Sequence, residues 1–164
     1  MTKTPQTPPG LRDSSRGGFS LIELMIVAAI VGILAGIAIP NLQAVLVRAR
    51  ATEVAADMEV VRVAALNYNA DQHVWPSEAT TGSVPTALDG YLPDGFSFAG
   101  NGYTLDYENW PLPSGLPGDP GTTTLIGISV TTTDAVLSNA VAEFLGSSIV
   151  FTVGQTHTIV IDRS

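Results

Sequence analysis

The sequence predicts an α+β fold, with one long N-terminal α-helix at about residues 19–72 packed on a small antiparallel β-sheet head and a short extra helix near residues 134–145. Three observations predict it: an apolar run, an amphipathic stripe that continues it, and β-branched segments separated by turns. The expected organisation is a leader peptide at 1–18, a transmembrane helix at 19–40, the amphipathic half of the same helix at 41–74 and a globular β-rich head at 75–164.

The first 18 residues are polar and rich in Pro, Gly and Ser. They carry Lys3, Arg12 and Arg16 against one acid, Asp13. Basic residues next to an apolar segment favour the cytoplasmic side of a membrane. We therefore expect a cytoplasmic leader that is removed from the mature protein.

The next segment, Phe19 to Ile39, has 21 residues and a single charged side chain, Glu23. At about 1.5 Å per residue its helix is about 31 Å long, which matches a hydrocarbon core of about 30 Å. This apolar segment predicts a single-pass inner-membrane protein with a cytoplasmic N-terminus and a periplasmic or extracellular head. A secretory signal peptide is the competing interpretation, since residues 35–38 loosely resemble its cleavage site, but its apolar core is roughly 7 to 15 residues.

An acid within a membrane helix costs about 2.5 to 3.5 kcal/mol on insertion scales. Glu23 is therefore a functional hypothesis that requires a partner. The neighbouring residues 17–27 read GGFSLIELMIV. This stretch resembles the N-terminal signature of type IV pilins and type II secretion pseudopilins, in which a prepilin peptidase cleaves after the glycine before phenylalanine and methylates the new amino terminus.

The resemblance implies a cleavage site formed by Gly17, Gly18 and Phe19, with the cut after Gly18 and N-methylation on Phe19. It also implies that Glu23 is the family's acid at the fifth mature position, used for assembly and registration. Pro40 falls where the family keeps a helix-kinking proline.

Small residues recur every four positions in this segment, at Ala28, Gly32 and Gly36. Such spacing lets helix backbones approach closely in lipid. Pro40 removes one helical hydrogen bond and marks a soft stretch of helix. These four residues are expected to serve helix packing and kinking, although Gly and Ala are also simply common in membrane helices.

After Asn41 the apolar residues follow one stripe of an amphipathic helix, with spacings of 4, 3, 4, 3, 4 and 3: Val47, Ala51, Val54, Met58, Val61, Ala65 and Tyr68. Glu59 and Arg62 lie off the stripe and can pair across the exposed face. Pro76 forbids continuation, so the helix is expected to end near residue 72.

The head begins with a Pro- and Gly-rich region, residues 76–121, which predicts mostly loop with short strands around 96–98 and 103–107. Residues 124–131, 148–153 and 156–161 are β-branched and predict strands, the last two joined by a tight turn at Gly154 and Gln155. A helix is expected at 134–145, capped by Thr133 or Asp134 and followed by Gly146.

Without the leader the chain has 4 basic and 14 acidic side chains, a net charge of −10. Nucleic acid is therefore not expected as a partner. The absence of cysteine excludes disulfides and thiol chemistry. No catalytic motif is present, so we predict no enzyme activity, no catalytic residue and no cofactor.

Asp106, Glu108 and Asp119 lie in the loop-rich region, where the major pseudopilins of the family resemblance hold calcium. They are calcium candidates without the regular ligand spacing of calcium loops, and no metal site is predicted. His157 is expected at a surface or strand edge, and Trp75 and Trp110 as core or turn anchors.

The resulting hypothesis is a structural subunit of a type IV pilus or a type II secretion pseudopilus, polymerised through its N-terminal helix. Its expected partners are copies of itself and other pilins in a filament, the prepilin peptidase, the inner-membrane assembly platform and the lipid bilayer. Many surface pilins close their C-terminal region with a disulfide, so the lack of cysteine leaves room for a periplasmic pseudopilin. The alternative is a non-polymerising, single-pass membrane-anchored binding module.

Overall fold

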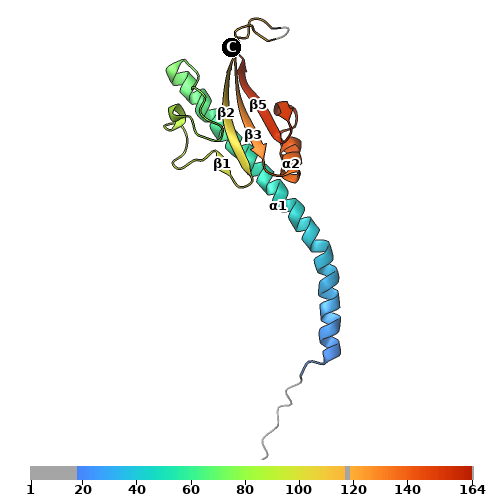
Figure 1. Cartoon of the computed structure of the whole chain (residues 1–164). Coiled ribbons are helices and arrows are strands. Elements are labelled where there is room, and N and C mark those ends of the chain that lie inside the picture. Colours follow the sequence, from blue (N-terminus) through green and yellow to red (C-terminus); the bar gives the residue numbers. More distant parts are fainter. Residues whose placement is uncertain (1–17, 117–118, 164) are drawn as a thin grey trace, which may run out of the picture. The chain divides into compact units, whose positions relative to one another are not determined.

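The computed structural model describes residues 18–116 and 119–163. The chain divides into two compact units, Met1–Asn41 and Leu42–Ser164. One helix, α1 (Leu21–Gln72), contributes to both units, and the second unit contains all the strands (Figure 1). The long N-terminal helix predicted from the apolar run and the stripe is confirmed.

In the second unit, α1 buries five residues of the predicted stripe, Ala51, Val54, Met58, Val61 and Ala65, and with them Ala64. The two ends of the predicted stripe, Val47 and Tyr68, are half-buried. The opposite face of α1 is exposed, and there the expected pair of Arg62 and Glu59 forms at 3.3 Å. Exposed pairs of this kind contribute little to stability. The helix ends as predicted, and His73 follows it in the left-handed conformation, with φ of 58° and its N–H donated to the Asn69 carbonyl.

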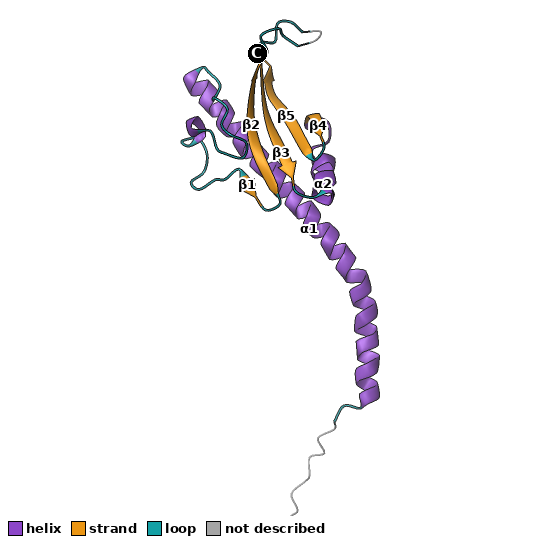
Figure 2. Cartoon of the chain, viewed as in Figure 1, coloured by secondary structure: helices purple, strands orange, loops and turns teal. Residues whose placement is uncertain are grey.

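The head is one antiparallel sheet of five strands in the order β1-β2-β3-β5-β4 (Figure 2). The strands are β1 (Ala99–Gly100), β2 (Tyr103–Pro111), β3 (Thr124–Thr132), β4 (Ile149–Val153) and β5 (Thr156–Arg163). Two short 3₁₀ turns, η1 (Thr86–Leu88) and η2 (Gly146–Ser148), flank them. The pairing of β3 with both β2 and β5 makes it the central strand.

One face of this sheet packs on α1 and forms the core. Tyr103, Leu105 and Tyr107 of β2 are buried together with the α1 stripe. The remaining buried side chains of this cluster come from four places: Leu88 in η1, Phe98 just before β1, Ile126, Ile128 and Val130 in β3, and Leu137 and Val141 in α2. The predicted α+β arrangement, a helix covering a small sheet, is therefore confirmed.

The sheet curves toward its other face. Trp110 on β2 meets Phe151 on β4 edge to face, with ring centroids 6.3 Å apart. Because β3 and β5 lie between these two strands, the side chains can meet only if the sheet curves toward this face. A Cβ added at Gly127 on β3 would lie 2.9 Å from the Ile159 carbonyl oxygen and 3.5 Å from the Trp110 ring, so glycine allows this close approach.

Two sequence predictions about the head are wrong. Residues 96–98 are not a strand, because pairing begins only at Ala99; Phe98 is instead buried in the core, edge to face with Phe96. Trp110 and Pro111, predicted as loop, are the end of β2. A proline at the end of a strand is tolerated because little further pairing is lost.

The short helix α2 (Ala135–Leu145) is capped as the sequence predicted. The carboxylate of Asp134 accepts the N–H groups of Val136 at 2.6 Å and Leu137 at 3.3 Å. Gly146, with φ of 50°, follows the last turn and donates its N–H to the Ala142 carbonyl. Both ends of α2 are therefore satisfied locally.

Replacing Asp134 with alanine is expected to destabilise the head by about 0.5 to 2 kcal/mol, because the two N–H groups lose their acceptor. Asp134→Asn keeps a side-chain oxygen and should lose much less. Urea denaturation of a fragment of residues 41–164 measures both. Equal losses for the two variants would contradict a capping role.

Candidate functional site: the amino-terminal helix

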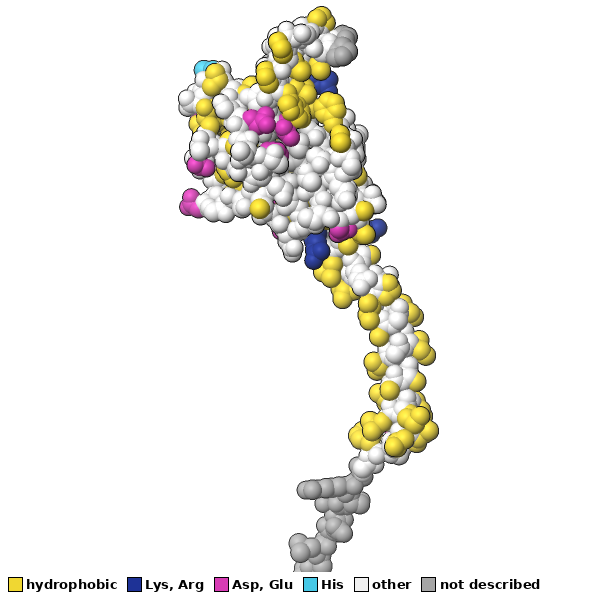
Figure 3. All heavy atoms as spheres, viewed as in Figure 1, with side chains coloured by type: hydrophobic (Ala, Val, Ile, Leu, Met, Phe, Trp, Pro, Cys, Tyr) yellow, Lys and Arg dark blue, Asp and Glu magenta, His cyan; other side chains and the backbone are white. Residues whose placement is uncertain are grey.

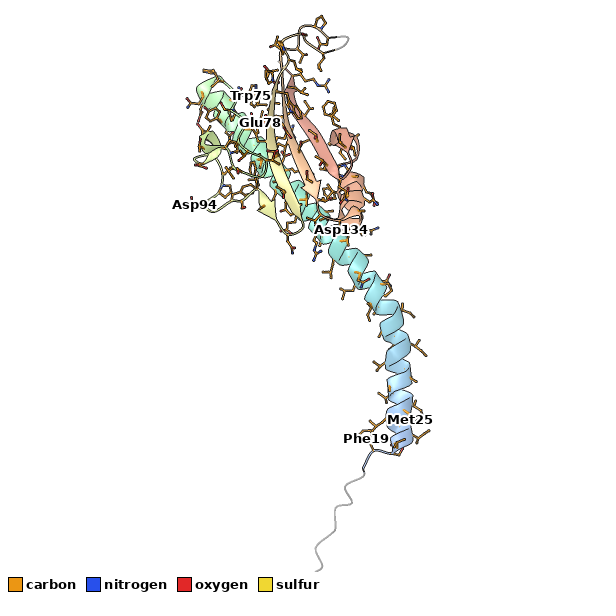
Figure 4. All side chains as sticks on the ribbon, in the orientation of Figure 1. Phe19, Met25, Trp75, Glu78, Asp94 and Asp134 are labelled. Carbon is orange, nitrogen blue, oxygen red and sulfur yellow. The ribbon has the colours of Figure 1, made fainter. Side chains whose placement is uncertain are left out.

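The segment around the expected cleavage site is exposed. Gly18, Phe19 and Ser20 precede α1, and the Phe19 side chain is 82% exposed. Figure 4 places Phe19 at the start of the helix, near Met25. A Cβ added at Gly18 would meet nothing within 4 Å. Gly17, the other residue of the expected site, lies outside the described residues.

Glu23 closes the first turn of the helix through reciprocal hydrogen bonds with Ser20. The Ser20 N–H donates to Glu23 Oε2 at 2.9 Å, and the Glu23 N–H donates to the Ser20 hydroxyl at 3.3 Å. This is a capping box, which satisfies two backbone donors that a helix N-terminus otherwise leaves free. Among the described residues Glu23 Oε1 has no hydrogen-bond partner.

Ser20 is a residue that the sequence analysis missed. The signal was present, because Ser20 and Glu23 form the Ser-x-x-Glu pattern directly before an apolar run. The charge of Glu23 in an apolar run and its position in the signature point to assembly and do not reveal the capping. The structure gives it a local role in the single chain as well.

The large apolar side chains of the first half of α1 are exposed and make no core, and Figure 3 shows many of them along the visible side of the helix. This part of α1 is long and apolar enough to cross a membrane, and none of it is buried within the chain. The same length and composition occur in core helices and in signal sequences, but a core helix is mostly buried.

The small residues of the predicted packing stripe are exposed. A Cβ added at Gly32 or Gly36 would meet nothing within 4 Å, and Ala28 is exposed beside them. These positions therefore leave room for another helix to approach, and no residue of the described part of the chain fills that room. Pro40 lies inside α1, and the side chain of Asn41 next to it donates to the Ile37 carbonyl at 3.0 Å.

The three calcium candidates occupy different environments. Asp106 and Glu108 lie on one side of β2, where burial raises the pKa of both carboxyl groups; hydrogen bonds from Thr81 to Asp106 and from Ser129 to Glu108 oppose the shift. Asp119 accepts the Thr122 hydroxyl at 2.6 Å in the following loop. Within residues 18–116 and 119–163, no group of three or more acidic, histidine or cysteine side chains is arranged to hold a metal ion.

His157 is buried, which corrects the expectation of a surface or edge position. Its Nε2 lies 2.9 Å from the Ser138 hydroxyl on α2, and its Nδ1 lies 3.2 Å from the Thr152 hydroxyl on β4. The strand pattern of β5 could not reveal that α2 covers this face. The three side chains connect α2, β4 and β5, and both His157 and Ser138 are buried.

Comparison with known proteins identifies the amino-terminal site. Residues 13–39 match the model of the prokaryotic N-terminal methylation motif. The chain is 43% identical over 72 residues to a fimbrial protein of Neisseria meningitidis serogroup A, and 41% identical over 70 residues to the type IV major pilin protein PilE of Neisseria gonorrhoeae. The amino-terminal part of the chain is therefore similar to type IV pilins. The matched motif contains the capping box and the exposed glycines Gly18, Gly32 and Gly36.

The likeness to these pilins covers part of each protein. The two Neisseria alignments cover 44% and 43% of this chain and 42% of each relative. A fimbrial protein of Pseudomonas aeruginosa is 50% identical over 48 residues, which are 29% of this chain and 31% of the relative. The chain thus spans about two fifths of the length of the Neisseria relatives. No solved structure matches it at a significant level.

Proposed function

We propose that this protein is a non-enzymatic structural subunit of a type IV pilus or a related type II secretion pseudopilus. The observation that carries the proposal is Glu23, an acid in an exposed apolar helix directly behind Gly18 and Phe19 in the methylation motif. The chain is inserted with its N-terminus in the cytoplasm, cleaved after Gly18 by a prepilin peptidase, methylated on Phe19, and taken into a filament of pilins by the inner-membrane assembly platform.

The hydrogen bonds of Glu23 support a role in assembly. Cleavage creates an amino group on Phe19, and an α-amino group with its ordinary pKa is largely protonated at neutral pH. The capping box occupies Oε2 of Glu23 and leaves Oε1 without a partner in the described residues. The carboxylate can therefore remain in its own helix cap while it accepts the Phe19 amine of a neighbouring subunit.

Such pairing would set the register between helices. A cation and a carboxylate that are each costly in lipid compensate each other only when two helices are aligned. Glu23 then rejects misaligned subunits more than it adds affinity. The exposed small residues Gly32 and Gly36, together with Ala28, allow the neighbouring helix to approach closely.

The second candidate is a membrane-anchored binding module that does not polymerise. The capping box favours it specifically, because Glu23 then has a use in an isolated anchor helix. The two candidates differ in what Glu23 must provide. A helix cap needs only an acceptor oxygen, whereas a register between subunits needs a charge.

Processing is tested by mass spectrometry of the protein purified from cells that possess a prepilin peptidase. The expected mature chain begins at Phe19 with a methylated amine. Gly18→Ala should tolerate processing better than Gly18→Leu, since the expected cleavage site requires a small residue. An intact Met1 terminus, or a mature start near Ile39, would refute processing after Gly18.

A further inference from the structure

The head has a hollow of about 490 Å³ beside the C-terminal end of α1. Its walls include Tyr68 on α1 and the segment after the helix, with Trp75, Glu78, Val84 and Pro85. Figure 4 shows Trp75 and Glu78 close together in the upper part of the head, at the opposite end from Asp134. The hollow is separate from the amino-terminal site and has no role in the proposed processing.

Glu78 is the charged side chain among the lining residues, and it is exposed. Its carboxylate accepts the backbone N–H of Asn109 at 3.3 Å, a long hydrogen bond. Glu78 forms no ion pair within the described residues, where the ion pair that does form joins Arg62 to Glu59. A carboxylate in this position has the capacity to bind a cationic group.

The remaining walls favour the same chemistry. Tyr68 and Trp75 supply aromatic rings, and Tyr91 supports Tyr68 edge to face with centroids 5.5 Å apart. A cation over an aromatic ring is attracted to its face, and guanidinium stacks there while also binding a carboxylate. Among the described residues, the buried Tyr107 hydroxyl has no hydrogen-bond partner. Burial raises the pKa of this hydroxyl, and the charges of Glu78 and Tyr68 add to the effect.

Two arginines of α1 that fit this hollow lie at the other end of the head. Arg48 and Arg50 are exposed and take part in no ion pair within the described residues. Along α1 they are about 36 Å and 33 Å from Gln72 at about 1.5 Å per residue, so they cannot reach the hollow of their own chain. Glu143 lies near Arg48, where both line a second hollow. Figure 3 shows basic side chains at the lower end of the head, with an acidic one beside them, and acidic side chains on its upper half, with a further basic one near the top.

We propose that the hollow beside Trp75 and Glu78 receives an arginine, Arg48 or Arg50, from the head of another copy of this chain. The inference rests on the proposed function, because a filament of parallel subunits displaced along its axis brings the base of one head to the level of the top of another. The contact joins two different surfaces. Repeated contacts of this kind extend along a filament and do not close a dimer.

The chain has no cysteine, so introduced cysteines give a test without background. Ala49→Cys lies between the two arginines, and Ser77→Cys lies beside Glu78; both positions are exposed. Filaments of the double variant treated with a short bis-maleimide should yield a ladder of covalent multimers. Each single variant cannot exceed a dimer, because one cysteine per chain forms one link.

Charge exchange adds a second test on the same cysteine background. Glu78→Arg, or Arg48→Glu combined with Arg50→Glu, should reduce the ladder on the order of tenfold through like-charge contacts, and combining all three changes should restore it. Filaments that form without a ladder in the double-cysteine chain would overturn this contact and leave the proposed function intact. A chain that is processed yet never forms filaments would overturn both.

Discussion

Replacing Glu23 with glutamine is expected to leave membrane insertion and cleavage after Gly18 intact, and to lower the ratio of filament-incorporated to membrane-resident subunit by about tenfold or more. Glutamine keeps the acceptor oxygen of the capping box, so the helix start is preserved. The carboxylate is lost, and a neighbouring Phe19 amine is left without its counter-charge in lipid. Removing one partner of such a pair costs about 3 to 5 kcal/mol.

Ser20→Ala is the matched control, because it removes the hydroxyl that the Glu23 N–H donates to while keeping the carboxylate. It should assemble near the wild-type ratio. Glu23→Ala, which removes both functions, should resemble Glu23→Gln, and Glu23→Asp should restore assembly partly at best. If Ser20→Ala failed while Glu23→Gln assembled normally, the helix cap would be the function of Glu23, and the membrane-anchored binding module would become the better proposal.

The second large effect concerns the packing of α1 on the sheet. Met58 is 1% exposed in the centre of the buried stripe. Met58→Ala in a fragment of residues 41–164 is expected to lower the free energy of unfolding by about 2 to 5 kcal/mol, through lost burial and the cavity that remains. Urea denaturation followed by circular dichroism measures it.

Val63→Ala supplies the control on the same helix. Val63 is 46% exposed, so its truncation removes little buried surface, and alanine has the higher helix propensity. Its stability should change by less than about 0.5 kcal/mol. A loss for Met58→Ala no larger than the loss for Val63→Ala would show that α1 does not hold the core of the isolated head.

The sequence predicted those parts of the fold that depend on local periodicity. The stripe through Val54, Met58 and Val61 repeats with the helical period, so it indicated which face of α1 is buried. β3 and β5 were recognisable as β-branched segments. The strand order could not be predicted from the residues alone, because the placement of β5 between β3 and β4 depends on pairing between residues far apart in the chain.

The site residues likewise differed in whether the sequence alone could predict them. Glu23 was identifiable because a single acid in an apolar run stands out, while its hydrogen bond with Ser20 required attention to a four-residue pattern. The burial of His157 and the hollow beside Trp75 arise from elements brought together by the fold. Neither has a local signature in the sequence.

The two edges of the sheet differ in a way that limits how detached heads can aggregate. At one edge β1 has only two residues. Farther along β2, Asn109 donates hydrogen bonds to the Glu78 carboxylate and the Pro76 carbonyl, so the loop after α1 covers β2 at that point. At the other edge β4 is exposed and apolar, with Val153 78% exposed, and within the described residues no further strand pairs with it. Edge-to-edge growth into a fibre requires two open edges on each molecule. Pairing of two β4 edges about a two-fold axis occupies both of them, so heads that associate through β4 are expected to stop at dimers.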